Sequence, residues 1–325
     1  MKSIIAILTA ATFTGPALAQ TVKDPAPGYP NKPVRLIVAY AAGGVADVIA
    51  RIVSQKLSDN LHQQFYVENV GGAGGNTAAG QVAKSPPDGY TIHVISTGFV
   101  VNPSLYAKVP YDPIKDFSPV TLVAASPNVV VVNPTVPAKT IPELVQLIRD
   151  NPAKYSFAGP GVGSTPHLSG ELFKLSFKLD LVHVPFTGAG PAIGATIGGH
   201  TPIAFTALPP ALAAAKDGQL RVLGVASEKR VAALPDVPTF SEQGIKDQDA
   251  DTLTGIVVPA GTPKEIVDLL YREIKKIVAD PDTQAKLATL GFVPIANTPE
   301  EFGKRIKDEM EKWGKVVRDS KLRVE

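Results

Sequence analysis

The chain has 325 residues, of which 44% are hydrophobic and 19% charged, and its formal net charge is +2. This composition is typical of a folded globular protein, and the length predicts about two domains. The near-neutral charge, without a basic stripe rich in aromatics, argues against nucleic acid as a partner. Cysteine is absent, which excludes disulfides, thiolate metal sites and a cysteine nucleophile.

Residues 1–19 have the pattern of a secretory signal peptide. Lys2 is positively charged, residues 4–13 are apolar, and Ala17-Leu18-Ala19 matches a cleavage site. A transmembrane anchor is the alternative, but a span needs about 20 apolar residues, and Pro16 interrupts this shorter run. We therefore predict cleavage after Ala19 and a mature protein in the bacterial periplasm.

The rest of the sequence alternates strand-like and helix-like segments, which predicts an α/β fold with largely parallel sheets. Apolar runs indicate strands at residues 34–40, 65–68, 90–96, 119–125, 129–133, 155–158, 181–184, 203–205 and 221–226. Apolar residues at helical spacing indicate helices between them, the first at residues 45–57 and the next ending at Lys84.

Several helix ends carry specific signals. Three threonines, each followed three residues later by glutamate, fit helix N-caps with capping boxes: Thr140, Thr262 and Thr298. Gly291 fits the left-handed residue that ends a helix. The final helix has an apolar stripe that we interpret as core packing, formed by Phe302, Ile306, Met310, Trp313 and Val317.

Two α/β units and a helical C-terminal region predict two lobes with a cleft between them. Each lobe is expected to contain a mainly parallel sheet flanked by helices. The chain is expected to cross between the lobes near residues 123–131 and again near residues 226–238. The first lobe then comprises residues 20–125 and 227–325, and the second comprises residues 126–226.

The strongest local signal is the turn at residues 40–47, where a strand ends, Gly43 and Gly44 remove side-chain bulk, and a helix begins. Helix N-termini have unpaired N–H groups and partial positive charge, so a carboxylate can bind there without an arginine. The alternative is a plain strand-to-helix turn in which Asp47 complements the helix dipole. From these residues alone, both interpretations stay open.

Two later turns have the same pattern. Residues 159–167 place three glycines, Ser164 and Thr165 before a helix, and residues 186–190 place Thr187 and Gly188 before another. One of the two hydroxyls at 164 and 165 is expected to cap the helix, which leaves the other free for a ligand.

Signals for an enzyme are weak. The glycine runs do not match G-x-G-x-x-G, and Walker A, H-E-x-x-H and G-x-S-x-G motifs are absent. A secreted hydrolase with Ser164 as nucleophile and His167 as base remains the alternative to a binding protein. We expect no catalytic residue, no metal and no cofactor.

Many short segments, in order from Tyr29 to the C-terminus, resemble one family. They include Gly43-Gly44 with Asp47 and Arg51, Val67-Glu68-Asn69 before the glycine loop at 72–75, Pro87-Asp88-Gly89-Tyr90-Thr91, Gly163-Ser164 with His167, His183-Val184-Pro185, and Leu234-Pro235-Asp236-Val237-Pro238-Thr239. The ordered set is similar to the substrate-binding receptors of tripartite tricarboxylate transporters, the Bug family.

This resemblance implies a monomeric periplasmic receptor of Venus-flytrap type, which closes on a small carboxylate and delivers it to membrane permease subunits. A receptor that serves a sensor system would use the same binding chemistry. The implied ligand-binding residues are Tyr40, Ala41, Ala42, Gly43, Gly44, Asp47, Thr97, Gly98, Gly163, Ser164, Thr165, His167, Thr187, Gly188 and Thr206.

Three segments depart from the family pattern. Ala39-Tyr40-Ala41 stands where a proline and an aromatic are frequent, Leu253 stands where tryptophan is common, and Thr206 stands where many members have an acidic or amide residue. The change at Thr206 argues against a ligand that carries an ammonium group. An unsubstituted dicarboxylate, tricarboxylate or aromatic carboxylate is therefore expected.

Overall fold

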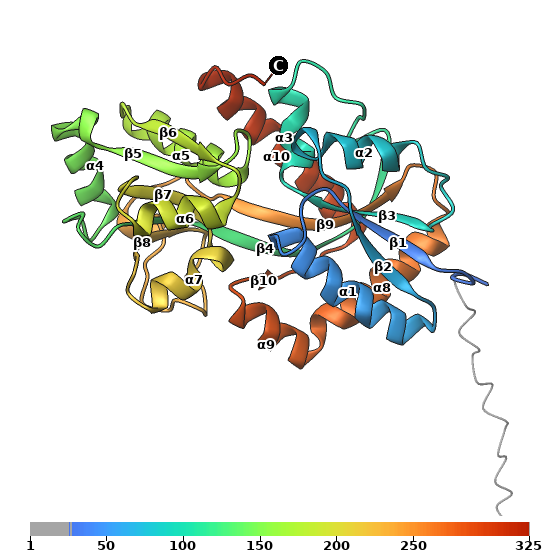
Figure 1. Cartoon of the computed structure of the whole chain (residues 1–325). Helices are drawn as coiled ribbons and strands as arrows, with labels where there is room; N and C mark the ends of the chain where they lie inside the picture. Colours follow the sequence, from blue (N-terminus) through green and yellow to red (C-terminus); the bar gives the residue numbers. More distant parts are fainter. Residues whose placement is uncertain (1–25, 27, 325) are drawn as a thin grey trace, which may run out of the picture.

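The computed structural model describes residue 26 and residues 28–324. The predicted signal peptide and its cleavage site lie outside these residues. Within the described part of the chain, no helix is long and apolar enough to cross a membrane. Figure 1 shows two lobes, joined by long strands that run between them.

The sheet of the first lobe has the strand order β2-β1-β3-β9-β4. Strands β2 (Phe65–Asn69), β1 (Val34–Val38) and β3 (Thr91–Ser96) are parallel. Strand β9 (Asp251–Pro259) runs antiparallel to β3, and β4 (Phe117–Val132) runs antiparallel to β9. The helices of this lobe are α1 (Val45–Leu61), α2 (Asn76–Ala83), α3 (Gly98–Leu105), α8 (Lys264–Ala279), α9 (Pro281–Thr289) and α10 (Pro299–Asp319).

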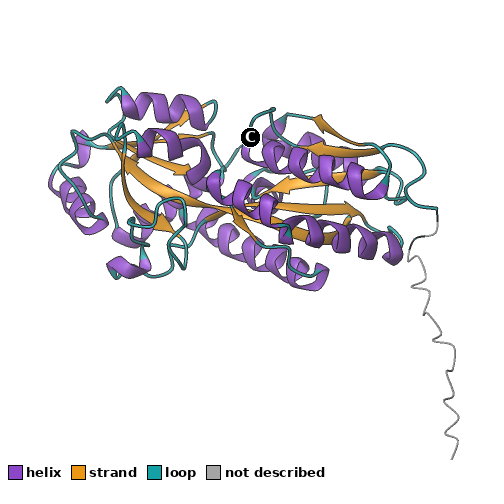
Figure 2. Cartoon of the chain, turned by 90° about the horizontal axis from the view of Figure 1, so that it is seen from below, coloured by secondary structure: helices purple, strands orange, loops and turns teal. Residues whose placement is uncertain are grey.

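The sheet of the second lobe continues from β4 in the order β4-β7-β5-β6, and β8 pairs with the other edge of β4. Its strands are β5 (Ser156–Pro160), β6 (Val182–Phe186), β7 (Ile203–Ala207) and β8 (Arg221–Ala226). Its helices are α4 (Ile141–Asp150), α5 (Thr165–Phe177), α6 (Ala189–Ile197) and α7 (Leu208–Lys216). Figure 2 shows helices on both faces of the sheets.

The predicted α/β fold with two lobes is confirmed, but the sheets are mixed rather than mainly parallel. The cause is the two strands that link the lobes. In the first lobe β9 runs antiparallel to β3 and β4, and in the second lobe β4 runs antiparallel to β7 and β8. β4 is one strand of 16 residues where the sequence predicted two, and it belongs to both sheets. The short β10 (Val293–Pro294) also pairs antiparallel with it.

The two crossings between the lobes lie side by side. β4 makes the first crossing near Pro127, whose partner in the ladder is Asp251, the first residue of β9. The amide of Asn128 donates to the carbonyl of Ala250, and the amide of Ala250 donates to the carbonyl of Ala226. Apolar residues between positions 227 and 250 pack with the second lobe, which favours a lobe boundary near Asp251; these residues are Val231, Leu234 and Val237.

Most of the predicted helix ends are confirmed. Thr140 and Thr298 accept from the amides three residues on, and Gly291 has a φ of 82° after α9. The prediction for Thr262 is wrong, because Pro263 caps α8 and the Thr262 hydroxyl donates to the carbonyl of Pro259 instead. The predicted core stripe of α10 is buried, apart from the half-buried Met310.

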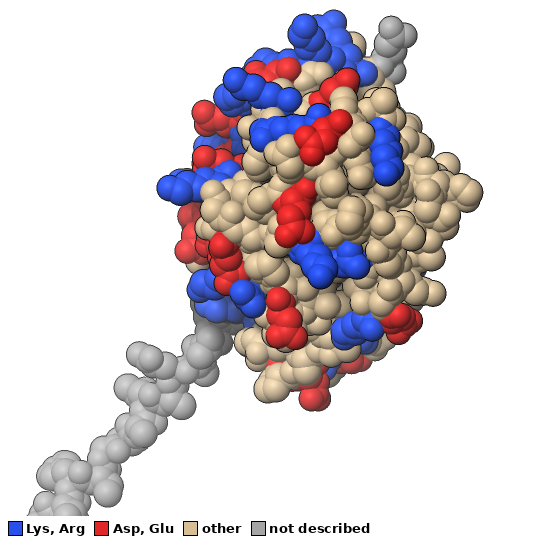
Figure 3. Space-filling view, turned by 90° about the vertical axis from the view of Figure 1, so that its left-hand side faces the viewer, with Lys and Arg blue, Asp and Glu red and all other residues tan. Residues whose placement is uncertain are grey.

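Charge is distributed unevenly on the second lobe. From Leu181 to Ala215, which covers β6, α6, β7 and most of α7, the sequence has no Lys, Arg, Asp or Glu. Figure 3, which looks at the second-lobe end, shows a wide area without charged side chains beside a more highly charged flank.

Candidate functional site

The strand directions bring the predicted loops to one boundary. β1 and β3 run in the same direction as β4, toward the second lobe, since β9 is antiparallel to both β3 and β4. β7 runs against β4, and β5 and β6 are parallel to β7, so these three strands run toward the first lobe. The carboxyl ends of both sets therefore meet between the lobes, where ligands bind in open α/β sheets.

The loop after β1 is the first part of the candidate site. Residues 41–43 are exposed, Gly43 has a φ of 80°, and Gly44 is the N-cap of α1. Glycine has no side chain that could bond the first helical amides, so these N–H groups remain available to an anion. The loop therefore presents backbone donors and no basic side chain.

Asp47 holds this loop in shape. Its carboxylate is 2% exposed and accepts from the amide of Gly43 at 2.8 Å, from Arg51 Nε at 2.9 Å and from Asn69 Nδ2 at 2.9 Å. Burial raises the pKa of Asp47, but the hydrogen bonds from Arg51, Gly43 and Asn69 outweigh burial and lower that pKa overall. The carboxylate is thus already engaged, in keeping with a positioning role.

Tyr40, Thr97 and Gly98 form the support behind the loop. The Tyr40 hydroxyl donates to the carbonyl of Gly74 at 3.3 Å, and a Cβ on Gly98 would lie 2.4 Å from that hydroxyl oxygen. Burial raises the pKa of Tyr40 to about 12. Thr97 Oγ1 accepts from the amide of Leu253 at 2.9 Å, so its side chain joins β3 to β9.

The loop after β5 is the second-lobe counterpart. Ser164 caps α5, accepts from the amide of His167 at 3.4 Å and donates to the carbonyl of Pro160 at 3.3 Å. Thr165 is 3% exposed. Gly163 lies against the first lobe, because a Cβ there would come within 2.1 Å of Leu105 Cδ2 in α3.

His167 braces this loop from behind. Its Nδ1 accepts from the amide of Gly163 at 3.1 Å, and its ring lies 4.1 Å from that of His183 between centroids. Burial, together with nearby positive charge, lowers the pKa of His167 to about 3 and that of His183 to about 4. Both rings are therefore neutral at physiological pH, and His167 is only 2% exposed.

The remaining predicted residues divide into exposed and buried groups. Thr187 is exposed and precedes Gly188, which caps α6 without a side chain. Thr206 is completely buried, and its hydroxyl donates to the carbonyl of Ala207 at 3.2 Å. The exposed or half-buried members of the predicted set are thus Tyr40, Ala41, Ala42, Gly43, Gly44, Ser164, Thr187 and Gly188.

Sequence reasoning missed two residues that shape this region, Asn69 and Leu105. Asn69 Nδ2 also donates to the carbonyl of Tyr40 at 2.9 Å. Asn69 directly follows a predicted strand, a position that could have indicated its role in the site. Leu105 belongs to α3, whose run Gly-Phe-Val-Val-Asn-Pro-Ser-Leu is buried on nearly all sides and lacks helical periodicity.

The hydrolase arrangement does not form. The hydroxyl of Ser164 donates to a backbone carbonyl, and the ring nitrogen of His167 nearest the loop accepts from the Gly163 amide. A nucleophile and its base need a hydrogen bond between hydroxyl and ring, and among the described contacts none joins the Ser164 hydroxyl to the His167 ring.

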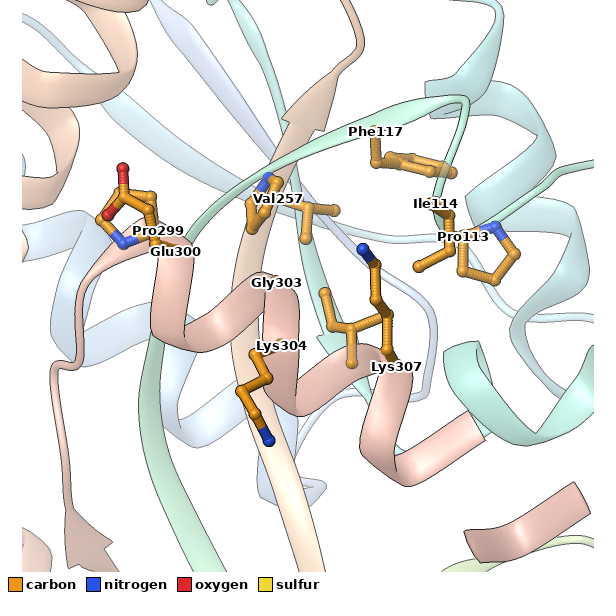
Figure 4. A pocket seen from close by; sticks show the side chains of 11 residues that line it. Pro113, Ile114, Phe117, Val257, Pro299, Glu300, Gly303, Lys304 and Lys307 are labelled. Carbon is orange, nitrogen blue, oxygen red and sulfur yellow. The ribbon is translucent and has the colours of Figure 1, made fainter. Parts of the chain in front are cut away.

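Two cavities lie away from the inter-lobe boundary. One, of about 490 Å³, is lined by α10 and the start of β4, and Figure 4 shows its Phe117, Ile114 and Lys307. The other, of about 370 Å³, lies between α1 and α9 and includes Arg51 and Lys286. Within the described part of the chain, no cluster of His, Asp or Glu is arranged to hold a metal ion.

Comparisons with solved structures agree with this architecture. A structure described as a periplasmic transporter has 39% identity and a TM-score of 0.83, covering 91% of this chain and 100% of that one. Rpa4515 of R. palustris, solved with adipate, has 30% identity and a TM-score of 0.84 at the same coverage. MatC of Rhodopseudomonas palustris, solved with bound malate, has 30% identity and a TM-score of 0.79, covering 89% and 100%.

Comparisons of sequence give the same result. BugT of Bordetella pertussis is 33% identical over 294 residues, which is 90% of each chain. The model of the tripartite tricarboxylate transporter family receptor, TctC, matches residues 49–322. This family consists of periplasmic solute-binding receptors and not of enzymes. The chain therefore belongs to the TctC family of tripartite tricarboxylate transporter receptors, to which the Bug proteins also belong.

Proposed function

We propose that this receptor binds a small dicarboxylate between its lobes and delivers it to the membrane subunits of a tripartite tricarboxylate-type transporter. The observation that carries the proposal is the glycine-capped N-terminus of α1, exposed at the boundary where the strand ends of both lobes meet. The candidate loops contain no lysine or arginine, so backbone amides and hydroxyls supply the donors.

The second lobe supports a two-ended ligand. Ser164 at the start of α5 and Thr187 before the glycine-capped α6 offer hydroxyls and amides opposite the first loop. One carboxylate at each side would use both sets of donors. Two relatives that are each 30% identical to this chain were solved with adipate and malate, which are dicarboxylates. The remaining predicted residues, Asp47, Thr97, Gly98, Gly163, Thr165, His167 and Thr206, then position these donors.

Binding requires the lobes to approach each other around β4 and β9. The ligand favours the closed state by its differential affinity for that state. Export precedes this function: we infer cleavage after Ala19, and N-terminal sequencing of the periplasmic protein should begin at Gln20. An intact Met1 in the membrane fraction would contradict it.

A thermal-shift screen tests the proposal. Adipate, malate and a matched uncharged diamide are compared, because a ligand at 100 times its dissociation constant adds about 2.7 kcal/mol of stability. We expect a shift with at least one dicarboxylate and none with the diamide. A panel of dicarboxylates without effect, or turnover of any of them, would contradict the assignment.

Gly44→Pro locates the site. The amide of Gly44 donates to the carbonyl of Ala41 at 3.3 Å, and a proline there would also force Gly43 out of its left-handed conformation. We expect calorimetric binding to be lost while the fold persists. Gly44→Ala is the matched control, because it keeps the N–H and its Cβ meets only the Ala41 oxygen at 3.3 Å.

A further inference from the structure

A cluster of charged side chains surrounds the residue at which the chain re-enters the first lobe. Asp251 begins β9 opposite Pro127 of β4, and its carboxylate lies 3.9 Å from Arg305 Nη2 in α10. The preceding residue, Ala250, is bonded to both Asn128 and Ala226 of the second lobe. Asp251 thus stands at the junction of the two crossings.

Arg305 is shared unequally between two carboxylates. Its Nη2 lies 2.7 Å from Glu309 Oε1, and its Nε is buried without a hydrogen-bond partner among the described residues. Glu309 also accepts from Trp313 Nε1 at 2.6 Å. A buried donor without a partner is energetically unfavourable. A small approach of Asp251 toward Arg305 would give that donor an acceptor.

Two further contacts connect this cluster to both lobes. Lys312 of α10 donates to the carbonyl of Asp249, on the segment that leads into β9. On the other side, the backbone carbonyl of Asp251 accepts from Thr97 Oγ1 at 3.4 Å. Thr97 is the N-cap of α3 and one of the candidate site residues. α10 itself packs against α3 of the first lobe and α5 of the second.

The charged groups around Asp251 have opposing effects on its pKa. Burial raises the pKa of Asp251 to about 6, Arg305 and Lys312 lower it, and Glu309 and Asp249 raise it. Its side chain is 25% exposed, and these four are the charged groups that face it within the described part of the chain. The carboxyl group therefore changes charge in mildly acidic solution, well above its ordinary pKa of 3.8.

The geometry points to Asp251 as a positioning residue that couples its ionisation, through Arg305, to the relative arrangement of the lobes and so to ligand affinity. The part of this proposal that concerns ligand affinity rests on the proposed function. In the arrangement seen here Arg305 is held by Glu309 and Asp251 binds a proton readily. In an alternative arrangement, Arg305 would leave Glu309 and pair fully with Asp251, which would keep Asp251 ionised. Acid therefore favours the present arrangement, and higher pH favours the alternative.

The chain contains a natural reporter for this switch. Trp313 is its one tryptophan, is completely buried, and is bonded to Glu309. Because Arg305 leaves Glu309 in the alternative arrangement, the emission of Trp313 should change as Asp251 ionises. In the mature protein without ligand, we expect one titration step with its midpoint near pH 6. Asp251→Asn should abolish the step, and Asp251→Glu should restore it.

Asp249→Asn is the matched control, because it removes a neighbouring exposed carboxylate and should leave the step in place. Arg305→Gln should also abolish the step, because no guanidinium group then moves between Glu309 and Asp251. An unchanged step in Asp251→Asn would overturn the proposal. If Asp251→Asn does not fold, a step that persists in Arg305→Gln overturns it equally.

Affinity provides the second arm, with adipate and malate as probes. In calorimetry, we expect the ratio of the dissociation constants of wild type and Asp251→Asn to change by about threefold or more between roughly pH 5 and pH 7, since the ratio cancels the titration of the ligand's own carboxyl groups. A constant ratio together with a normal Trp313 step would refute the coupling to binding. Absence of binding at either pH would instead count against the dicarboxylate function, and the Trp313 step would still decide the switch.

Discussion

The loops after β1 and β5 hold equivalent positions in the two lobes but are braced by opposite chemistry. In the first lobe an ionised Asp47, paired with Arg51 and Asn69, accepts from the amide of Gly43. In the second, the neutral ring of His167 accepts from the amide of Gly163. Each brace reaches four residues back from within the first turn of a helix. Both loops thus have a side-chain acceptor at the same position, but the carboxylate and the imidazole respond differently to pH.

The largest expected effect is a loss of folding stability in acid, because the second-lobe brace depends on neutral histidine and the first-lobe brace on an ionised aspartate. Burial lowers the pKa of three histidines, to about 4 for His93, about 3 for His167 and about 4 for His183. His93 and His167 are buried, and His183 is half-buried. Below pH 6.5 the unfolded chain binds protons that the folded chain does not. Each such group then reduces stability by about 1.4 kcal/mol per pH unit, down to its folded pKa.

Asp251 opposes this trend, because its raised pKa adds stability as the pH falls from about 6 toward 3.8. Asp47, whose pKa is lowered, contributes stability above pH 3.8 and loses it only below that value. We therefore expect a net loss of several kcal/mol between pH 6.5 and pH 4, measured by denaturant unfolding at each pH. His183→Phe should reduce the slope, and a flat profile would contradict the neutral second-lobe brace.

Asp47→Asn should break the first brace. The substitution weakens three hydrogen bonds to a buried charge, so we expect a loss of about 3 kcal/mol of stability and of most ligand affinity. Asp280→Asn is the control, since Asp280 likewise accepts hydrogen bonds at the start of a helix, α9, and pairs with a basic residue, Lys56, but lies outside the candidate loops. Equal affinity losses in the two variants would show that Asp47 has no particular role in the loop.

Ser164→Ala should have the smallest effect. Loss of the N-cap costs about 1 kcal/mol of stability, and loss of a hydroxyl near a bound carboxylate should weaken binding roughly tenfold. Thr140→Ala removes an equivalent cap from α4, far from the strand ends. Calorimetry should therefore show weaker binding for Ser164→Ala only, and normal affinity there would remove Ser164 from the ligand contacts.

Local chemistry made much of this fold predictable. Thr140, Thr298 and Gly291 mark helix ends because caps and left-handed residues depend on only a few neighbouring residues. The braces at Asp47 and His167 span four residues and could also have been inferred from sequence. The loops they support were identified as candidate ligand positions, and their contact with ligand stays a prediction.

Long-range features were beyond the reach of sequence patterns. The helix α3 has no periodic apolar face because its surroundings are buried on several sides. The pairing of Asp251 with Arg305 depends on how α10 packs over the sheet, and nothing near either residue in the sequence indicates it. The assignment of residues 227–250 likewise depends on packing against β8 rather than on local pattern.

Pro127 has a mechanical consequence for the receptor. A proline within a strand between two sheets is unusual, since it lacks the N–H that would bond the neighbouring strand. β4 therefore lacks one backbone donor at the first crossing, between the ladders of the two lobes. In the closure that we propose, Pro127 would be the place where these ladders turn relative to each other. Loops at the strand ends could then change to suit a different ligand without altering the axis about which the lobes turn.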